Sequence, residues 1–281
     1  MGRGDLTDEE WGRLRPLLPV SNGRCGRWRD HRQVIDGILH RVRTGVQWRD
    51  LPERFGPWKT VYERHRSVDS TAMRAHQHAA GARRTPPPTV TASKGAAGGT
   101  PERITVDEPR RPAGGGGPAG EGLGRSRGGF TTKVHLSADG RCRPLSLIVT
   151  PGQRADCTQF IPVLEEIRVP RLGPGRPRKK PDSVAADKAY SNGPCRRYLR
   201  RRGIKHAIPE KSDSRAARLK RGTGGGRPPG FDKERYKKRN VVERAIKRLK
   251  QSRAVATRYD KRGHVFLGTV TAAALLIWLR T

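Results

Sequence analysis

The chain has 281 residues, of which 60 are Lys or Arg and 26 are Asp or Glu, so its formal charge is +34 and its pI is near 11.4. Only 33% of the residues are hydrophobic, which argues against one core that extends over the whole chain. Such an excess of positive charge opposes compaction unless a polyanion binds, and it indicates a nucleic-acid partner. A membrane partner is not expected, because the longest apolar run, residues 269–279, is too short to span a bilayer.

The cysteines and the N-terminus favour a cytoplasmic protein. The N-terminal residues, MGRGDLTDEEW, lack the apolar segment of a secretory signal. The cysteines form no CxxC pair, so the sequence predicts neither a zinc ribbon nor a disulfide framework. A reducing compartment suits such scattered cysteines best. They are Cys25, Cys142, Cys157 and Cys195.

Residues 1–66 are expected to form an N-terminal helical domain. Thr7, with Glu10 three residues later, has the pattern of a helix capping box. A second helix is predicted over residues 32–43, where apolar side chains form one stripe and Gly45 follows as a stop. The segment TGVQWRDLPERFGPWKTVYERHR predicts a turn and a third, short helix. These helices are similar to a helix-turn-helix module that binds DNA, and a purely structural helical cap is the alternative.

Residues 67–281 are expected to form a second domain, interrupted by a segment of different composition. Pro, Gly, Ala and Thr dominate residues 83–122, which predicts a disordered insertion. After it, GGFTTKVHLSADG and CRPLSLIVTPG predict two strands around a turn at Asp139 and Gly140. The elements predicted further along are helices over residues 158–167 and 194–202, strands in SVAADKAY and KHAIP, a flexible basic loop, KSDSRAARLKRGTGGGRPPG, and a buried helix over residues 269–279. This order of strands and helices gives an α/β fold class.

The run YKKRNVVERAIKRLK is predicted to place four different functional groups on one face of a helix. At about 100° per residue, Arg239, Glu243 and Lys250 fall within roughly 60° of Tyr236. A carboxylate among basic groups suits a metal-dependent nucleic-acid enzyme, because the acid can hold a cation while the bases hold the phosphate backbone. A solvated basic helix with one incidental Glu is the alternative.

Glu243 has two potential carboxylate partners elsewhere in the sequence. Asp69 lies in RSVDSTAMRAHQH on a predicted strand, and Asp187 ends the strand predicted in SVAADKAY. Carboxylates on adjacent strands and a facing helix can converge to hold two divalent cations, and Mg²⁺ prefers such oxygen ligands. Asp69 could instead stabilise a turn, and Asp187 could instead pair with Lys188.

Three other features are given mainly structural interpretations. His76 and His78 could suggest zinc, but no Cys or further His lies at ligand spacing, which favours a structural role or one close to DNA. Asp156 is interpreted as the N-cap of the helix that follows it, and an acid that supports the metal site is the alternative. GRSRGG, before the strand at Thr131, is interpreted as a flexible basic loop that could contact phosphate, although it lacks the Lys-Ser/Thr of a P-loop.

The combined text of several segments resembles the transposases of bacterial insertion sequences, in the superfamily named after insertion sequences four and five. In chain order these segments are SVDSTAMRAHQHAAGA, LGRSRGGFTTKVHL, LIVTPGQRAD, VAADKAYSN and RYKKRNVVERAIKRLKQ. LTDEEWGRLRPLLP and TGVQWRDLPERFGPWKTVYERHR are similar to the N-terminal domain of the same group. The resemblance covers most of the chain apart from residues 83–122.

This resemblance implies a fold, a reaction and a set of site residues. The implied catalytic domain is ribonuclease-H-like, with a mixed sheet flanked by helices, and binds two Mg²⁺ or Mn²⁺ ions. The implied reaction is hydrolysis at the end of the element followed by attack of the freed 3′-hydroxyl on target DNA. We expect a homodimer on double-stranded DNA, at terminal inverted repeats and target sites, in the bacterial cytoplasm at the nucleoid. By position, Asp69, Asp187 and Glu243 would be the catalytic metal ligands, and Tyr236, Arg239 and Lys250 would position the DNA.

Two departures from the family pattern concern catalysis. Only two residues separate Arg66 from Asp69, where members of the family have a further helical stretch, and residues 83–122 are longer than the usual loop. The hypothesis that follows is an internally deleted transposase whose DNA-binding surface is better preserved than its catalysis. A catalytically impaired remnant that acts only as a DNA-binding repressor is the alternative. A basic RNA-binding or ribosome-associated protein is the third possibility, in which the three acids would be dispensable.

Overall fold

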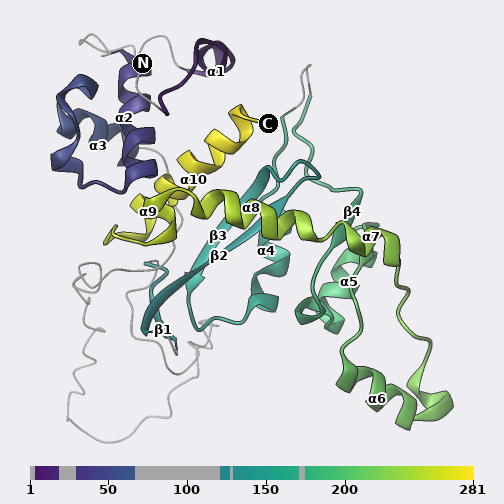
Figure 1. The fold of residues 1–281 in the computed structure, drawn as a ribbon. Helices are drawn as coiled ribbons and strands as arrows, with labels where there is room; N and C mark the ends of the chain where they lie inside the picture. The colour runs from purple at the N-terminus through teal and green to yellow at the C-terminus, as the bar shows by residue number, and fades with distance from the viewer. Residues whose placement is uncertain (1–3, 19–29, 67–120, 127–128, 171–174) are drawn as a thin grey trace, which may run out of the picture.

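The computed structural model describes residues 4–18, 30–66, 121–126, 129–170 and 175–281 (Figure 1). The N-terminal part contains α1 (Asp8–Leu14), α2 (His31–Thr44) and α3 (Trp58–Arg66). The central part contains β1 (Gly124–Ser126), β2 (Gly129–Ala138), β3 (Pro144–Pro151), α4 (Phe160–Glu165), β4 (Ser183–Ala185), α5 (Gly193–Arg201) and β5 (Lys205–Ala207). The C-terminal part contains α6 (Ser212–Lys220), α7 (Lys233–Lys237), α8 (Asn240–Lys250), α9 (Arg253–Ala256) and α10 (Gly263–Leu279).

The N-terminal helices begin and end where their sequences predict. The Thr7 hydroxyl accepts a hydrogen bond from the Glu10 backbone N–H, and the Glu10 carboxylate accepts one from the Thr7 N–H, so the capping box is confirmed. Gly45 ends α2 at a φ of 74°, in the left-handed region that favours glycine. Within α2, a Cβ on Gly37 would come within 3.0 Å of the Phe55 Cβ and 3.2 Å of Val61, so the glycine allows α2 and α3 to pack closely.

The C-terminal helix α10 is the centre of the hydrophobic core. Its apolar residues pack on one side against α2 and on the other against β2 and β3. Phe266 and Val270 are completely buried there, together with Val42 of α2. Figure 1 shows α10, in yellow, between the N-terminal helices and the sheet. The predicted buried helix is therefore confirmed, and it joins the two halves of the chain into one core.

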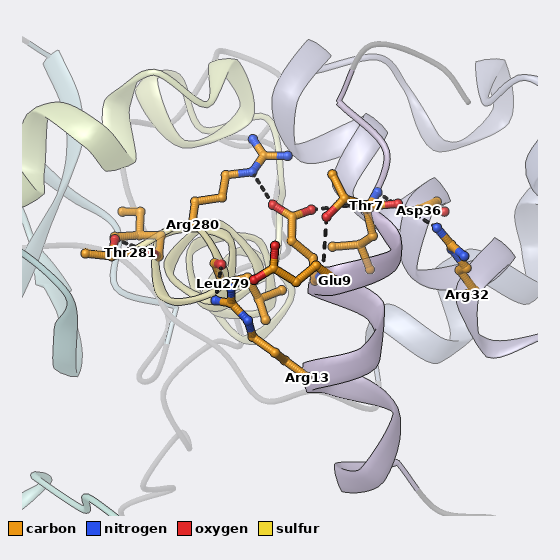
Figure 2. Close-up of polar contacts among 11 residues, drawn as sticks. Thr7, Glu9, Arg13, Arg32, Asp36, Leu279, Arg280 and Thr281 are labelled. Atoms are coloured by element: carbon orange, nitrogen blue, oxygen red, sulfur yellow. Dashed lines mark hydrogen bonds and ion pairs between the residues drawn. The ribbon is translucent and has the colours of Figure 1, made fainter.

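Polar contacts fix α1 to the C-terminal end of α10 (Figure 2). The Arg13 guanidinium donates to the Leu279 carbonyl at 2.9 Å, and Arg280 donates to the Glu10 carboxylate at 2.9 Å. Both donors satisfy or neutralise groups at helix ends, where unpaired carbonyls and acidic first turns leave negative charge. The N-terminal segment is thus held by residues from the last turn of the chain.

A buried ion pair links α2 to the segment before α10. Arg41 donates to Asp260 at 2.7 Å and 3.3 Å, and each side chain is only 4% exposed. The Thr269 hydroxyl lies beside both groups, at 3.1 Å from Arg41 and 3.0 Å from Asp260, and His65 of α3 approaches it at 3.4 Å. Buried charges are tolerated only when they are paired and hydrogen-bonded, which is the case here.

The strands form two small sheets within the described residues. β1, β2 and β3 are antiparallel neighbours in that order, and the β2–β3 hairpin has a register shift between Ser137 and Ala138. β4 and β5 pair in parallel. The mixed α/β class predicted from the order of elements is confirmed.

Two predicted loops are regular structure instead. Gly124–Ser126, in the expected GRSRGG loop, pairs with β2 as strand β1. The expected flexible segment after β5 contains α6, because SDSRAARLK is rich in helix-forming residues and Arg218 forms two hydrogen bonds, at 3.1 Å each, with Glu210. Figure 1 shows α6 extending away from the sheets, and none of its residues is buried.

Several predictions fall outside the described residues. These concern Asp69 and its strand, His76 and His78, Cys25, and residues 83–120 of the expected insertion. Among the helices that the structure describes, none is long and apolar enough to cross a membrane.

Replacing Asp260 with Asn should lower the free energy of unfolding by about 3 kcal/mol or more, because the buried Arg41 guanidinium loses its counter-charge. Urea denaturation measures the change. Asp182→Asn is the matched control, because the Asp182 side chain is 87% exposed in its pair with Arg178, and its loss should cost less than about 1 kcal/mol. Equal free energies of unfolding for Asp260→Asn and Asp182→Asn would contradict the conclusion that Asp260 neutralises the buried Arg41.

Acid should destabilise the protein through His65. Burial lowers the pKa of its imidazole from 6.5 to about 4. The folded state therefore favours the neutral ring, and the stability that this contributes is present above pH 6.5 and is lost as the pH falls from 6.5 to about 4. The loss is up to about 3 kcal/mol.

Denaturation of the wild type and of His65→Gln over this pH range measures the effect. The variant should have the shallower pH dependence, although not a flat one, because burial also lowers the pKa of His40 and His135. His264→Gln, at an exposed residue of α10, is the control. If the free energy of unfolding has the same slope against pH in the wild type and in His65→Gln, the assignment of this pH dependence to His65 is refuted.

Candidate active site

A cleft of about 350 Å³ lies between β2, β4, α4 and the start of α8. Its lining includes strand residues, such as His135 and Ala185, together with Arg239 and Glu243. Apolar side chains and carboxylates both line the cleft. The carboxylates are Asp156, Asp187 and Glu243.

Asp187 lies two residues beyond β4, where the chain turns into a short 3-10 helix, Lys188–Tyr190. Its carboxylate accepts a hydrogen bond from the Lys188 backbone N–H at 2.7 Å, which caps that turn. The Asp187 side chain remains 46% exposed, so it can also bind a second group. The backbone of this turn therefore orients the carboxylate without burying it.

Arg239 brings Asp187 and Glu243 to one place. Its guanidinium donates to the Glu243 carboxylate at 2.9 Å, and its other terminal nitrogen lies 3.8 Å from the Asp187 carboxylate. Two carboxylates that are far apart in the sequence thus share one positive charge, which reduces their mutual repulsion. This is the convergence of acids that the sequence predicted for these two positions.

The prediction of one continuous helical face from Tyr236 to Lys250 is wrong. α7 ends at Lys237 and α8 begins at Asn240, and between them the backbone tightens into i to i+3 hydrogen bonds, such as Arg239 N–H to Tyr236 C=O at 2.9 Å. Such a tightened turn changes the angle per residue, so periodicity does not carry across it. The ion pairs of Arg239 lie at this turn.

Tyr236 and Lys250 therefore occupy different places relative to the two acids. The ring of Tyr236 lies 5.6 Å from the Arg239 guanidinium and 5.2 Å from the Phe231 ring, so it supports Arg239 from the side of α7. Lys250 is exposed at the far end of α8, roughly 10 Å from Glu243 along the helix axis. It follows the same side of α8 as Glu243 but lies outside the cleft.

Asp156 is not the helix cap that the sequence suggested. Ala155 holds the cap position of the 3-10 helix Asp156–Gln159, and no side chain caps it. Asp156 instead pairs with Lys133 of β2 at 3.0 Å and lies 4.0 Å from His135. The alternative interpretation, an acid that supports the site, fits this position better. Its signal in the sequence was the position of Asp156 in the turn shortly after β3, the strand that pairs with the one carrying Lys133.

His135 and Tyr190 are site residues that sequence reasoning did not identify. Burial lowers the pKa of His135, whose Nε2 lies 2.8 Å from the Thr150 hydroxyl. Burial raises the pKa of the Tyr190 hydroxyl to about 12, and the charges of Asp156 and Asp187 act in the same direction. His135 is buried and Tyr190 partly buried by contacts between distant segments, so no local pattern revealed them.

Asp187 and Glu243 are chemically suited to a hard divalent cation. Carboxylate oxygens are the ligands that Mg²⁺ and Mn²⁺ prefer, and both groups are accessible from the cleft. Within the described ranges, no group of three His, Cys, Asp or Glu side chains is close enough together to hold a metal ion. The described residues therefore supply two acids of the expected three.

Comparisons with known proteins identify the family of this chain. A family model of the transposase DDE domain matches residues 63–278, and a model described as a putative transposase of the IS4/5 family matches residues 6–74. The chain belongs to the IS4/5-type DDE transposases. Membership of this family indicates a function in transposition. Transposases act on DNA, and DDE domains generally use divalent metal ions.

Curated relatives place this transposase among insertion-sequence proteins. It is 30% identical to a putative transposase for insertion sequence element IS6501 from Brucella ovis, over 54% of this chain and the whole relative. It is 31% identical to a putative transposase for element IS402 from Burkholderia cepacia, over 48% of this chain and 56% of the relative. An uncharacterized protein of Sinorhizobium fredii is 36% identical over 28% of this chain and 83% of its own length. No solved structure matches the chain.

The charge of Asp156 should be visible in the titration of His135. Asp156 favours the imidazolium and partly opposes the effect of burial, so Asp156→Asn should lower the pKa of His135 further. NMR titration of the imidazole measures this shift. Asp182→Asn, which removes a remote exposed carboxylate, should leave it unchanged. A pKa that rises or stays constant in Asp156→Asn would contradict the placement of Asp156.

Proposed function

We propose that this transposase binds the ends of its insertion sequence and catalyses metal-dependent DNA cleavage and strand transfer, with Asp69, Asp187 and Glu243 as the metal ligands. The observation that carries the proposal is the meeting of Asp187 and Glu243 at Arg239, on one side of a cleft. Asp69 enters by the resemblance of its segment to the family pattern, since it lies outside the described residues.

The two acids fit a divalent cation electrostatically. Arg239 already supplies a positive charge that both carboxylates share, so a cation at the same place would meet the same attraction. When bound, a pair of divalent ions would stabilise the attacking and leaving oxygens of an in-line displacement at phosphorus. Arg239 would then be available to pair with the DNA phosphate, because a guanidinium binds phosphate as it binds carboxylate.

The remaining named residues are proposed to position DNA. Tyr236 packs beside Arg239 and would hold its guanidinium in place, and Lys250 continues the basic surface along α8. The helices of residues 1–66 would contact terminal repeats as a helix-turn-helix-like unit, with target DNA and a homodimer completing the complex at the nucleoid. The charge of +34 supports binding to more than one segment of duplex DNA.

A ribonuclease-H-like sheet is part of the proposal. Among the described strands, β4 pairs only with β5, and residues 132–138 of β2 pair only with β3. These edges of β2 and β4 border the same cleft. One further strand that paired with both would unite the two sheets into one mixed sheet with the acids at its edge.

A second candidate, a DNA-binding repressor without catalysis, is favoured by one feature. α3 ends at Arg66, so only two residues separate this helix from Asp69. A central strand of about five or six residues has little room to form before that acid. An error of 1 Å in a catalytic constellation can lower the rate on the order of 100-fold.

Cleavage of a duplex that carries the inverted-repeat end of the element, with Mg²⁺ or Mn²⁺, tests the proposal. Asp187→Asn and Glu243→Gln should each lower the cleavage rate on the order of 100-fold or more, because each removes charge that holds the cations. Asp182→Asn, close to β4 but exposed, should cleave like the wild type. Cleavage that survives loss of Asp187 would refute the assigned site. Tight, salt-sensitive binding without cleavage by the wild type would establish the repressor.

A further inference from the structure

A second cleft, of about 950 Å³, lies between the N-terminal helices and the segment that leads into α10. One wall is the 3-10 helix Trp48–Asp50 together with α3, and the other is the start of α9 and residues 259–262. α9 lies beyond the end of α8 that is opposite to Glu243 (Figure 1). The second cleft is therefore separate from the cleft that holds the acids.

The segment Arg258–Lys261 alternates between buried and exposed residues. Arg258 is completely buried and Asp260 is 7% exposed, whereas Tyr259 is 37% exposed and Lys261 is exposed. The two buried side chains thus point into the protein, and Tyr259 and Lys261 line the cleft.

Buried hydrogen bonds and an ion pair hold residues 258–261 in place. Arg258 donates to the Asp260 carbonyl at 2.8 Å, to the Glu121 carbonyl at 3.0 Å and to the Lys261 carbonyl at 3.1 Å. Burial lowers the pKa of Arg258 to about 10, which still leaves it charged near neutrality. Asp260 is held by the ion pair with Arg41. Burial of the charged groups of Arg258, Asp260 and Arg41 costs free energy. Their contacts fix the backbone on which Tyr259 and Lys261 face the cleft.

The cleft also has positive charge that the protein does not neutralise. Arg262 pairs with Glu121 at 2.9 Å. By contrast, Arg49, Arg253 and Lys261 form no ion pair with any described residue, although all three line the cleft. The stem of Arg253 packs over Gly45, whose added Cβ would lie 3.3 Å from it, so this cation is held at the rim.

Aromatic rings line the same cleft as these cations. Tyr259 is the most accessible of them, and Trp58 stands on the opposite wall with Arg49 at 5.7 Å from its ring. Cations alone would suit any polyanion, whereas an accessible ring between cations suits a nucleotide, because the base can stack while the phosphates are neutralised. A base within an intact duplex has both faces covered by its neighbours and cannot stack in this way.

We propose that this cleft binds an unpaired segment of a DNA strand, with one base stacked on Tyr259 and the adjoining phosphates at Arg49, Arg253 and Lys261. That the nucleic acid is DNA rests on the proposed function. α8 leads from Glu243, at the first cleft, to α9, whose Arg253 lines this cleft. A strand opened near the acids would therefore run along α8 toward this cleft.

The test is binding of a fluorescent single-stranded DNA oligonucleotide, in EDTA and with excess unlabelled duplex as competitor. Tyr259→Ala should weaken binding about ten-fold, because it removes a stacked base contact. Tyr259→Phe should bind like the wild type, since it retains the ring. Phe130→Ala is the matched control, because Phe130 is 38% exposed and has Arg125 at 5.6 Å but lies on β2, away from the cleft.

Two further readouts separate stacking from charge. A 2-aminopurine base in the oligonucleotide should be quenched by the wild type and by Tyr259→Phe, but not by Tyr259→Ala at saturation. Lys261→Gln should retain quenching and lower the slope of log affinity against log salt by about one, as expected for one lost phosphate contact.

Three outcomes would overturn the proposal. They are unchanged binding and quenching in Tyr259→Ala, an equal loss in Phe130→Ala, and tighter Tyr259-dependent binding to RNA of the same sequence than to DNA. EDTA makes the binding test independent of metal-dependent cleavage. If the wild type cleaves no DNA but shows Tyr259-dependent quenching, the strand-binding proposal holds and the catalytic proposal fails. If the wild type cleaves DNA but shows no Tyr259-dependent quenching, the catalytic proposal holds and the strand-binding proposal fails.

Discussion

The buried ion pair between Arg41 and Asp260 is the interaction on which the arrangement of this protein depends. It joins α2, near the start of the chain, to the segment before α10, and the Thr269 hydroxyl forms hydrogen bonds with both charged groups. Around it, apolar residues from α2, α10, β2 and β3 form one core. Both ends of the sequence contribute to this core, and a second cluster of buried residues, which includes Phe160 and Leu199, lies around α4 and α5. The N-terminal helices are consequently fixed relative to α8 and α9.

Repulsion between like charges determines how the surface around this core is organised. Carboxylates are the minority in a chain of charge +34, and those that line the first cleft are each paired with a cationic side chain. Arg239 neutralises Asp187 and Glu243 together, and Lys133 neutralises Asp156. At the second cleft the relation is reversed, because Arg49, Arg253 and Lys261 have no carboxylate partner among the described residues. This difference in pairing underlies the two proposals, a cation at the first cleft and phosphate at the second.

The two clefts lie at opposite ends of α8, which makes this helix the element that relates them. Its buried residues, Ala245 and Leu249, pack it onto the core, while Glu243 and Lys250 remain exposed on its solvent side. A rigid helix keeps a fixed distance between an acid in its first turn and a basic residue in its last turn. A transposase that handles a strand end and its flanking DNA needs contacts at such fixed separations. Positions on a helix provide them more precisely than positions on loops do.

Local sequence determined the elements whose stability comes from neighbouring residues. The Thr7 and Glu10 capping box, the stop at Gly45, the β2–β3 hairpin and the largely apolar α10 each have their cause within a few residues, and the family followed from ordered motifs. The pairing of Asp187 with Arg239, the role of Asp156 and the break between α7 and α8 were decided by tertiary structure, because each depends on a partner from a distant segment. The same holds for Tyr259, whose exposure results from the burial of Arg258 and Asp260 on either side of it. Periodicity records which residues share a face, but only the folded chain determines which charges meet across a cleft.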